Sequence, residues 1–318
     1  MSAKAKEAAE TVAVADERCA SCGVKGGGDD NITLKNCNGC FLVKYCSVKC
    51  QREHWPEHKR ACKKRAAELR DELLFKQPES TDLGDCPICQ LPIPIPPPTL
   101  QDGTRYTIYG CCSKVVCNGC IYANLMRERE ARLPPSCPFC RTQMPKSEKE
   151  SHQLVMKRAE ANDPEALCTL GNNRFIGGEH AFAVDCWEKA AALGHMHSHY
   201  KLSVVYHNGQ GAGKNLKKAT YHVEQAAIGG HVLARHNLGA WELMQNRNID
   251  RAVKHFTIAA KLGLDLSLQT LKKCYAGGDV SKEEFAAALR AHKVAVDAMK
   301  SPQRELAAQK MRGGAIYG

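Results

Sequence analysis

The chain has 318 residues, of which 25% are charged, and its formal net charge is +11. This length predicts two or three domains, and the charged fraction is typical of a soluble protein. No apolar stretch reaches the roughly 20 residues of a membrane-spanning helix, and the N-terminal residues lack the apolar centre of a secretory signal, so we expect an intracellular protein, cytoplasmic, nuclear or both.

The cysteines are concentrated in the first half of the sequence. Fifteen of the 18 lie between Cys19 and Cys140, mostly as CxxC pairs. In a chain without an export signal, this placement indicates metal ligation rather than disulfides. If fifteen thiolates and one histidine hold four zinc ions, the net charge falls to roughly +4, because zinc-bound thiols are deprotonated. The charge therefore argues against nucleic acid as a partner.

We expect residues 1–18 to be a disordered N-terminus and residues 19–62, the first module, to bind metal. A CxxC turn presents two thiolates to one ion, and the other two donors must come from elsewhere. His58 and Cys62 are spaced i and i+4, so they would share one helical face and supply such a pair. The module has eight donors, enough for two tetrahedral zinc ions: Cys19, Cys22, Cys37, Cys40, Cys46, Cys50, His58 and Cys62.

The segment "YCSVKCQREHWPEHKRAC" (45–62) closely resembles the MYND zinc finger. The likeness includes Gln51, Trp55 and Lys59 at the family's spacing. It implies two interleaved sites, one made by Cys19, Cys22, Cys46 and Cys50 and the other by Cys37, Cys40, His58 and Cys62. MYND fingers bind short proline-containing motifs, and some occur in SET-type lysine methyltransferases. We find no SET cofactor or substrate motif in the remaining sequence.

Two residues of this segment need a separate interpretation. Trp55 is either the small core of the module or part of a peptide-docking surface, and we favour the core because large aromatic side chains bury the most area. His54 lies off the ligand pattern, so we expect it to be exposed and uninvolved.

Residues 63–85 are predicted to be a mixed-charge helix followed by a linker at 78–85. Residues 86–141, the second module, again contain eight potential donors. "CPIC", a long loop, "CCSKVVCNGC" and "CPFCR" resemble an all-cysteine RING finger. The resemblance implies one zinc ion on Cys86, Cys89, Cys117 and Cys120 and another on Cys111, Cys112, Cys137 and Cys140.

The adjacent pair Cys111 and Cys112 departs from the RING pattern, which separates these two ligands. Extended backbone would point neighbouring side chains to opposite faces, so both can reach one ion only through a bent local backbone. Cys112 has the family's spacing to Cys117, which leaves Cys111 as the less certain ligand. We favour both binding, because structural zinc is almost always four-coordinate. Four zinc ions are therefore expected in all.

The RING resemblance implies that the second module holds a ubiquitin-conjugating enzyme and favours transfer by positioning. The expected contact residues lie on the surface: Ile88, Ile121, Leu125, Pro138 and Arg141. The tryptophan that many ligase RING fingers carry on the following helix is missing. The alternative is a plain docking module, in which Ile88 and Leu125 only cover the zinc sites. The loop "LPIPIPPPTL" (91–100) is expected to be stiff and extended; a second interpretation is that it imitates the proline-containing ligands of the first module.

The second half of the chain has helical periodicity and internal repeats. Ser147 with Glu150 predicts a capped connecting helix within 142–162, and Asp163 followed by Pro164 predicts the next helix start. Residues 163–194, 195–230, 231–263 and, more weakly, 264–295 each read as a helical hairpin, which is typical of a solenoid. Their "LG" pairs, at Leu170-Gly171 and Leu238-Gly239, resemble Sel-one-like repeats of the tetratricopeptide superfamily.

Smaller features of this half complete the prediction. "HMHSHY" (195–200) is interpreted as structural, because His195 and His231 recur at the inter-repeat turn. Cys168, Cys186 and Cys274 are expected to be buried apolar residues. Residues 163–300 would form the repeat domain and 301–318 a short helix with a mobile tail.

Together these patterns predict a mostly α protein with two cross-brace zinc modules ahead of a short α-solenoid. The leading functional hypothesis is a RING-type ubiquitin-protein ligase, whose repeats and MYND finger recruit client proteins. The alternative is a non-enzymatic, zinc-dependent scaffold for protein–protein interaction.

Overall fold

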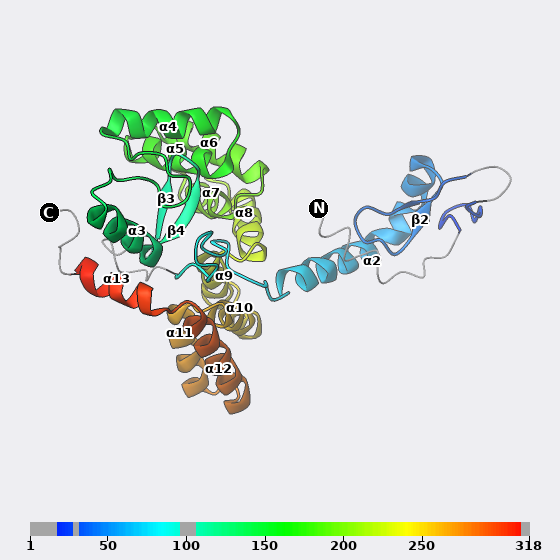
Figure 1. Ribbon diagram of the computed structural model, residues 1–318. Helices are drawn as coiled ribbons and strands as arrows, with labels where there is room; N and C mark the ends of the chain where they lie inside the picture. Colours follow the sequence, from blue (N-terminus) through cyan, green and yellow to red (C-terminus); the bar gives the residue numbers. More distant parts are fainter. Residues whose placement is uncertain (1–17, 28–31, 96–105, 313–318) are drawn as a thin grey trace. The chain divides into compact units, whose positions relative to one another are not determined.

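The computed structural model describes residues 18–27, 32–95 and 106–312 (Figure 1). Residues 1–17 of the expected disordered N-terminus and residues 96–100 of the proline-rich loop lie outside the described residues. The chain divides into two compact units, one ending at Lys76 and the other beginning at Gln77. The fold is mostly helical, as the sequence predicts. Among the described residues, no helix is both long and apolar enough to cross a lipid bilayer.

The first unit combines a two-stranded antiparallel sheet with one long helix. Strands β1 (Lys35–Asn36) and β2 (Lys44–Tyr45) pair directly, and helix α2 runs from Val48 to Leu74. Ser47 begins the helix, because its hydroxyl accepts a hydrogen bond from the N–H of Cys50 at 3.2 Å. The mixed-charge helix expected after residue 62 is therefore the second half of a helix that starts inside the first module.

The second module is built on a β-hairpin and a helix. Strands β3 (Tyr106–Tyr109) and β4 (Lys114–Cys117) pair antiparallel, with Tyr106 opposite Cys117. Helix α3 (Asn118–Glu130) follows directly. Helix α4 (Glu148–Glu160) connects this module to the repeats, and its N-cap is Ser147, as predicted.

Four helical hairpins stack after α4. Asp163 caps the first hairpin through the N–H of Ala166, as the sequence predicts. The hairpins are α5 (Pro164–Ile176) with α6 (His180–Ala192), α7 (Met196–Asn208) with α8 (Leu216–Ile228), α9 (Val232–Met244) with α10 (Ile249–Lys261), and α11 (Asp265–Gly277) with α12 (Lys282–Ala298).

The glycine of each "LG" pair makes room for an aromatic ring of the second helix. A Cβ on Gly171 would lie 2.6 Å from Nε1 of Trp187, and one on Gly239 would lie 2.7 Å from Cε1 of Phe256. Both rings are almost fully buried. Cys168, Cys186 and Cys274 are buried as expected, at 1%, 3% and 8% exposure. The cysteines and both aromatic residues therefore belong to the buried core of the solenoid.

The histidines at the inter-repeat turns have structural roles, which confirms that prediction. His195 begins α7 by accepting from the N–H of Ser198 at 3.2 Å, and His231 begins α9 by accepting from the N–H of Ala234 at 3.1 Å. Each histidine therefore supplies the hydrogen-bond acceptor that an N-cap requires.

Within the second unit, the second module is joined to the helical half at several points. The guanidinium of Arg158 on α4 donates to the hydroxyl of Ser113 at 2.7 Å, and in the linker that precedes the module the N–H of Asp82 donates to the carbonyl of Gly230 at 3.3 Å. Helix α13 (Pro302–Arg312) packs on α3 (Figure 1). Residues 301–318 were expected to form a short helix with a mobile tail, and their described part is this helix, which is docked on α3.

Candidate metal centres

The predicted donors come together in four groups of four. Within each group the donor atoms lie within 4.8 Å of one another. The groups match the two interleaved arrangements implied by the resemblances: Cys19, Cys22, Cys46 and Cys50; Cys37, Cys40, His58 and Cys62; Cys86, Cys89, Cys117 and Cys120; Cys111, Cys112, Cys137 and Cys140.

Four CxxC turns share one backbone design. In each, the residue after the second cysteine donates its N–H to the carbonyl of the first cysteine, at 2.8 to 2.9 Å. That residue also has a positive φ, between 55° and 74°. This left-handed residue closes the turn, and the closed turn brings both thiols to the same side. The four residues are Gly23, Phe41, Gln90 and Arg141.

The distances between donor atoms fit zinc. Four thiolates at 2.3 Å from a tetrahedral ion lie about 3.8 Å from one another. Neighbouring sulfurs in these groups are 3.3 to 3.9 Å apart, and Sγ of Cys40 lies 3.2 Å from Nε2 of His58. The donor set of soft thiolates and one imidazole is also the set that structural zinc prefers. The four groups therefore fit zinc binding.

The vicinal cysteines occupy the turn of hairpin β3–β4. The carbonyl of Tyr109 accepts from the N–H of Cys112 at 3.2 Å and from the N–H of Ser113 at 2.7 Å, and Ser113 has a φ of 56°. This bend directs Sγ of Cys111 to within 3.3 Å of Cys140 and Sγ of Cys112 to within 3.8 Å of Cys137. The backbone is bent as predicted, and both thiols face the same group.

Without a cation, the clustered thiols have pKa values that are displaced from the usual range in both directions. Burial and the neighbouring Cys37 raise the pKa of Cys62 to about 12. Although burial opposes it, hydrogen bonds from the Thr142 hydroxyl and backbone lower the pKa of Cys140 to about 6. A divalent ion at the centre of each group would stabilise all the thiolates together, as zinc does in structural sites.

Two residues of the first module, both close to His58, differ from expectation. Trp55 is 40% exposed, so it is not the buried core of the first module. That core consists of cysteines and Tyr45. His54, expected to be an exposed bystander, is partly buried: its ring stacks on His58 at 5.6 Å, and its Nδ1 lies 3.0 Å from the Tyr45 hydroxyl. Its spacing of four residues from His58 on a helix was the available sequence signal.

The expected contact residues of the second module are in different environments. Ile88 is 42% exposed and Arg141 is exposed, whereas Ile121 and Leu125 on α3 are partly buried. Pro138, expected on the surface, is buried, because the last zinc turn folds it inward. Its neighbour Phe139 is 42% exposed instead.

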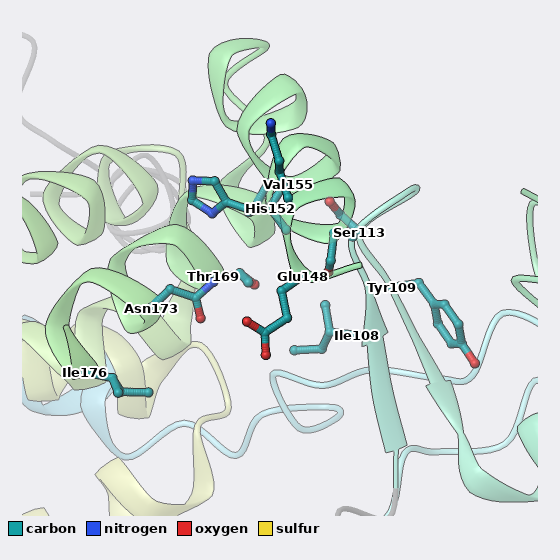
Figure 2. Close-up of a pocket in the computed structure, with 13 residues that line it drawn as sticks. Ile108, Tyr109, Ser113, Glu148, His152, Val155, Thr169, Asn173 and Ile176 are labelled. Atoms are coloured by element: carbon teal, nitrogen blue, oxygen red, sulfur yellow. The ribbon is translucent and has the colours of Figure 1, made fainter. Parts of the chain in front are cut away.

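A cavity of 840 Å³ lies between the second module and the first repeat (Figure 2). The tip of hairpin β3–β4 forms one wall, and helices α4 and α5 form the others. Its lining is mixed: Glu148 and Asn173 extend into it, while Ile108 and Ile176 contribute apolar surface (Figure 2). Because the wall includes Gly110 and Ser113, the shape of the cavity depends on the turn that carries Cys111 and Cys112.

These features define a protein with cysteine-based zinc modules and a helical solenoid, and comparisons with known families agree. The MYND finger model matches residues 19–62, and the Sel1 repeat model matches residues 180–195, 197–231 and 232–264. No RING family model matches the second module. The chain therefore carries a MYND finger followed by Sel1 repeats, which indicates a role in protein–protein interaction.

Matches to individual proteins are short or distant. The human protein "Histone-lysine N-methyltransferase SMYD3" is 57% identical over 30 residues, which are 9% of this chain and 7% of that protein. "Tudor domain-containing protein 1" of Oryzias latipes is 35% identical over 67 residues, 21% of this chain and 5% of that protein. The chain thus spans less than a tenth of these relatives. A Sel1 repeat protein from Oxalobacter formigenes is 21% identical with a TM-score of 0.41, over 63% of this chain and 80% of that one.

Proposed function

We propose that this protein is a zinc-dependent scaffold that binds segments of partner proteins through its MYND finger and its repeats. The observation that carries the proposal is the exposure of Trp55. An indole is the largest apolar side chain, and 40% of it remains in solvent beside the zinc ligand His58. Leu42 and Val48 of the same module are also exposed, at 49% and 62%. None of the three contributes to the cysteine core.

The chemistry of an exposed indole favours a proline-containing segment as its ligand. A flat aromatic face packs well against a pyrrolidine ring, and a proline-rich segment is already extended, so it loses little conformational entropy on binding. This agrees with the ligand class that the MYND resemblance implies. The cavity beside α4 and α5 offers a second surface, at which the second module and the repeats would contact one partner together.

Binding of a library of short proline-containing peptides tests the first surface. Fluorescence anisotropy with the zinc-loaded chain should identify binders, and Trp55→Ala should weaken them at least tenfold. Phe182→Ala is the matched control, because Phe182 is an aromatic residue of similar exposure, 45%, on a repeat helix. Both variants must retain the wild-type zinc content. Unchanged binding by Trp55→Ala would contradict the proposal.

A second candidate function is RING-type ubiquitin ligation by the second module. Its cysteines are grouped in the interleaved arrangement that the RING resemblance implies, and the turn residues Ile88 and Arg141 are exposed. Buried Pro138 and the packing of α13 on α3 argue against it. The test is chain formation with activating enzyme, ubiquitin and a panel of conjugating enzymes. If the module is a ligase, Ile88→Ala and Arg141→Ala should each reduce chain formation at least tenfold. If no enzyme of the panel supports chain formation, only the scaffold function remains.

A further inference from the structure

The C-terminal helix α13 places an arginine against a zinc turn of the second module. Arg304 is buried, with 9% exposure. Its guanidinium donates to Sγ of Cys89 at 3.3 Å and to the carbonyl oxygens of Leu91 at 3.1 Å, Pro92 at 2.7 Å and Met299 at 2.7 Å. Three of these four acceptors lie within residues 89–92, at the end of the turn that carries Cys86 and Cys89 and directly after it.

The start of α3 is shaped to receive this helix. A Cβ on Gly119 would lie 2.8 Å from Cγ of Arg304 and 3.1 Å from its backbone nitrogen, so the glycine allows the close approach. Ala307, one turn further along α13, is fully buried. Gly119 lies between Cys117 and Cys120, two members of the same donor group. The helix therefore packs on the zinc-binding segment itself.

The charge of the site explains why a guanidinium belongs there. Four thiolates and one Zn²⁺ leave a net charge of −2, which is unfavourable in a partly buried environment. A cation that donates a hydrogen bond to a ligand sulfur offsets this charge and fixes the orientation of the ligand. Arginine suits the position because its planar fork can donate to the sulfur and to several carbonyl oxygens at once.

We infer that Arg304, through its hydrogen bond to Sγ of Cys89, stabilises the zinc site formed by Cys86, Cys89, Cys117 and Cys120, and that docking of α13 slows metal loss from this site. It follows that α13 covers part of α3 from within the chain, and a partner that binds there must displace it. The inference rests on zinc occupying the site, as the proposed function requires.

Zinc release from the full-length chain tests the role of Arg304. A metallochromic chelator follows the release of each zinc ion, and Arg304→Ala should release one of the four at least tenfold faster than wild type, as expected for loss of an outer-shell partner. Arg304→Lys should rescue the rate in part, because lysine keeps the charge but lacks the fork. The control is Lys310→Ala, an exposed cation on the same helix.

Cadmium-113 NMR of the protein with cadmium in place of zinc adds a site-specific measurement. The signal of one all-cysteine site should shift in Arg304→Ala and stay in place in Lys310→Ala. An unchanged spectrum with unchanged release rates would overturn the inference. So would equal acceleration of all four ions, because that reports general destabilisation. Wild-type protein that binds no zinc at this group would instead remove the premise of the proposed function.

Gly119→Ala tests the docking geometry with Arg304 intact. An alanine ordinarily stabilises a helix relative to glycine. Here its Cβ should push α13 away, so the variant should reproduce the faster release of Arg304→Ala. If α13 loses its protection against hydrogen exchange while zinc release stays at the wild-type rate, the packing of α13 on α3 has no effect on the metal.

Discussion

The two zinc modules differ in what holds their donor groups together. The buried cluster of the first module contains cysteines and Tyr45, and its aliphatic residues are only partly buried around it. The second module encloses Ile93, Tyr109 and Val116 together with its cysteines. It is also tied to α4 through Arg158. The difference indicates that metal alone holds the first module, whereas packing and metal share that work in the second.

Complete removal of zinc should produce the largest difference in stability between the two modules. Structural zinc supplies roughly 10–16 kcal/mol of apparent binding free energy in small zinc fingers. We therefore expect chelation to abolish amide protection over residues 19–62, while α5 to α12 keep theirs and the second module loses only part. Hydrogen exchange with mass spectrometry measures all three regions in one sample.

Re-addition of zinc is the control for this experiment, and it should restore protection over residues 19–62 if no thiol has been oxidised. A first module that remains protected after exhaustive chelation would contradict the comparison, since its remaining core is too small to fold alone.

A pair of core truncations should give the next largest difference. Ile93 is fully buried, so Ile93→Ala should lower the free energy of unfolding of the second unit by about 2–5 kcal/mol. Leu34 of the first module is only partly buried, and Leu34→Ala should lower that of the first unit by about 1 kcal/mol. Both free energies of unfolding can be measured by urea denaturation of the zinc-loaded chain, with hydrogen exchange as the probe of each unit.

The exposed Ile88 provides the matched control, because Ile88→Ala removes the same atoms from the surface and should change stability by less than about 0.5 kcal/mol. Equal costs for Ile93→Ala and Leu34→Ala would mean that the two modules rely on packing to the same degree.

The same contrast explains what the sequence could predict. Donor groups follow from spacing, because a CxxC turn is a local structure with its own hydrogen bonds. The repeats were readable for a similar reason, since Gly171 and Gly239 mark close packing within one hairpin. Local spacing does not report tertiary burial. The exposure of Trp55 depends on tertiary burial, and so does the docking of Arg304, whose partner Cys89 lies 215 residues away in the sequence. Neither could be predicted from spacing.

Acid should reveal a smaller difference that involves histidine rather than metal. His199 on α7 and His222 on α8 face each other in the second repeat, with their Nδ1 atoms 2.9 Å apart. Burial, together with His199, lowers the pKa of His222 to about 4. Glu188 opposes this effect, and Lys218 adds to it. The folded repeat therefore holds a neutral ring that is protonated in the unfolded chain below about pH 6.5.

The sign of the pH effect follows from this difference. Between about pH 6.5 and pH 4 the unfolded chain binds the additional proton, so the stability of the second unit should fall as the pH is lowered, by at most about 3 kcal/mol from this residue. Above pH 6.5 both states are neutral, and the contribution is constant. His222→Gln should reduce the slope in this window, measured by urea denaturation at a series of pH values.

Zinc release must be followed in the same samples, because acid also protonates the ligand thiolates and would unfold the modules independently. At each pH, the first unit should lose structure only in proportion to the zinc it loses. The repeats of the wild-type chain should weaken before any metal is released. If His222→Gln shows the wild-type slope while zinc remains bound, the histidine pair does not set the acid sensitivity of the solenoid, and another buried histidine such as His255, whose pKa burial lowers to about 3, accounts for it.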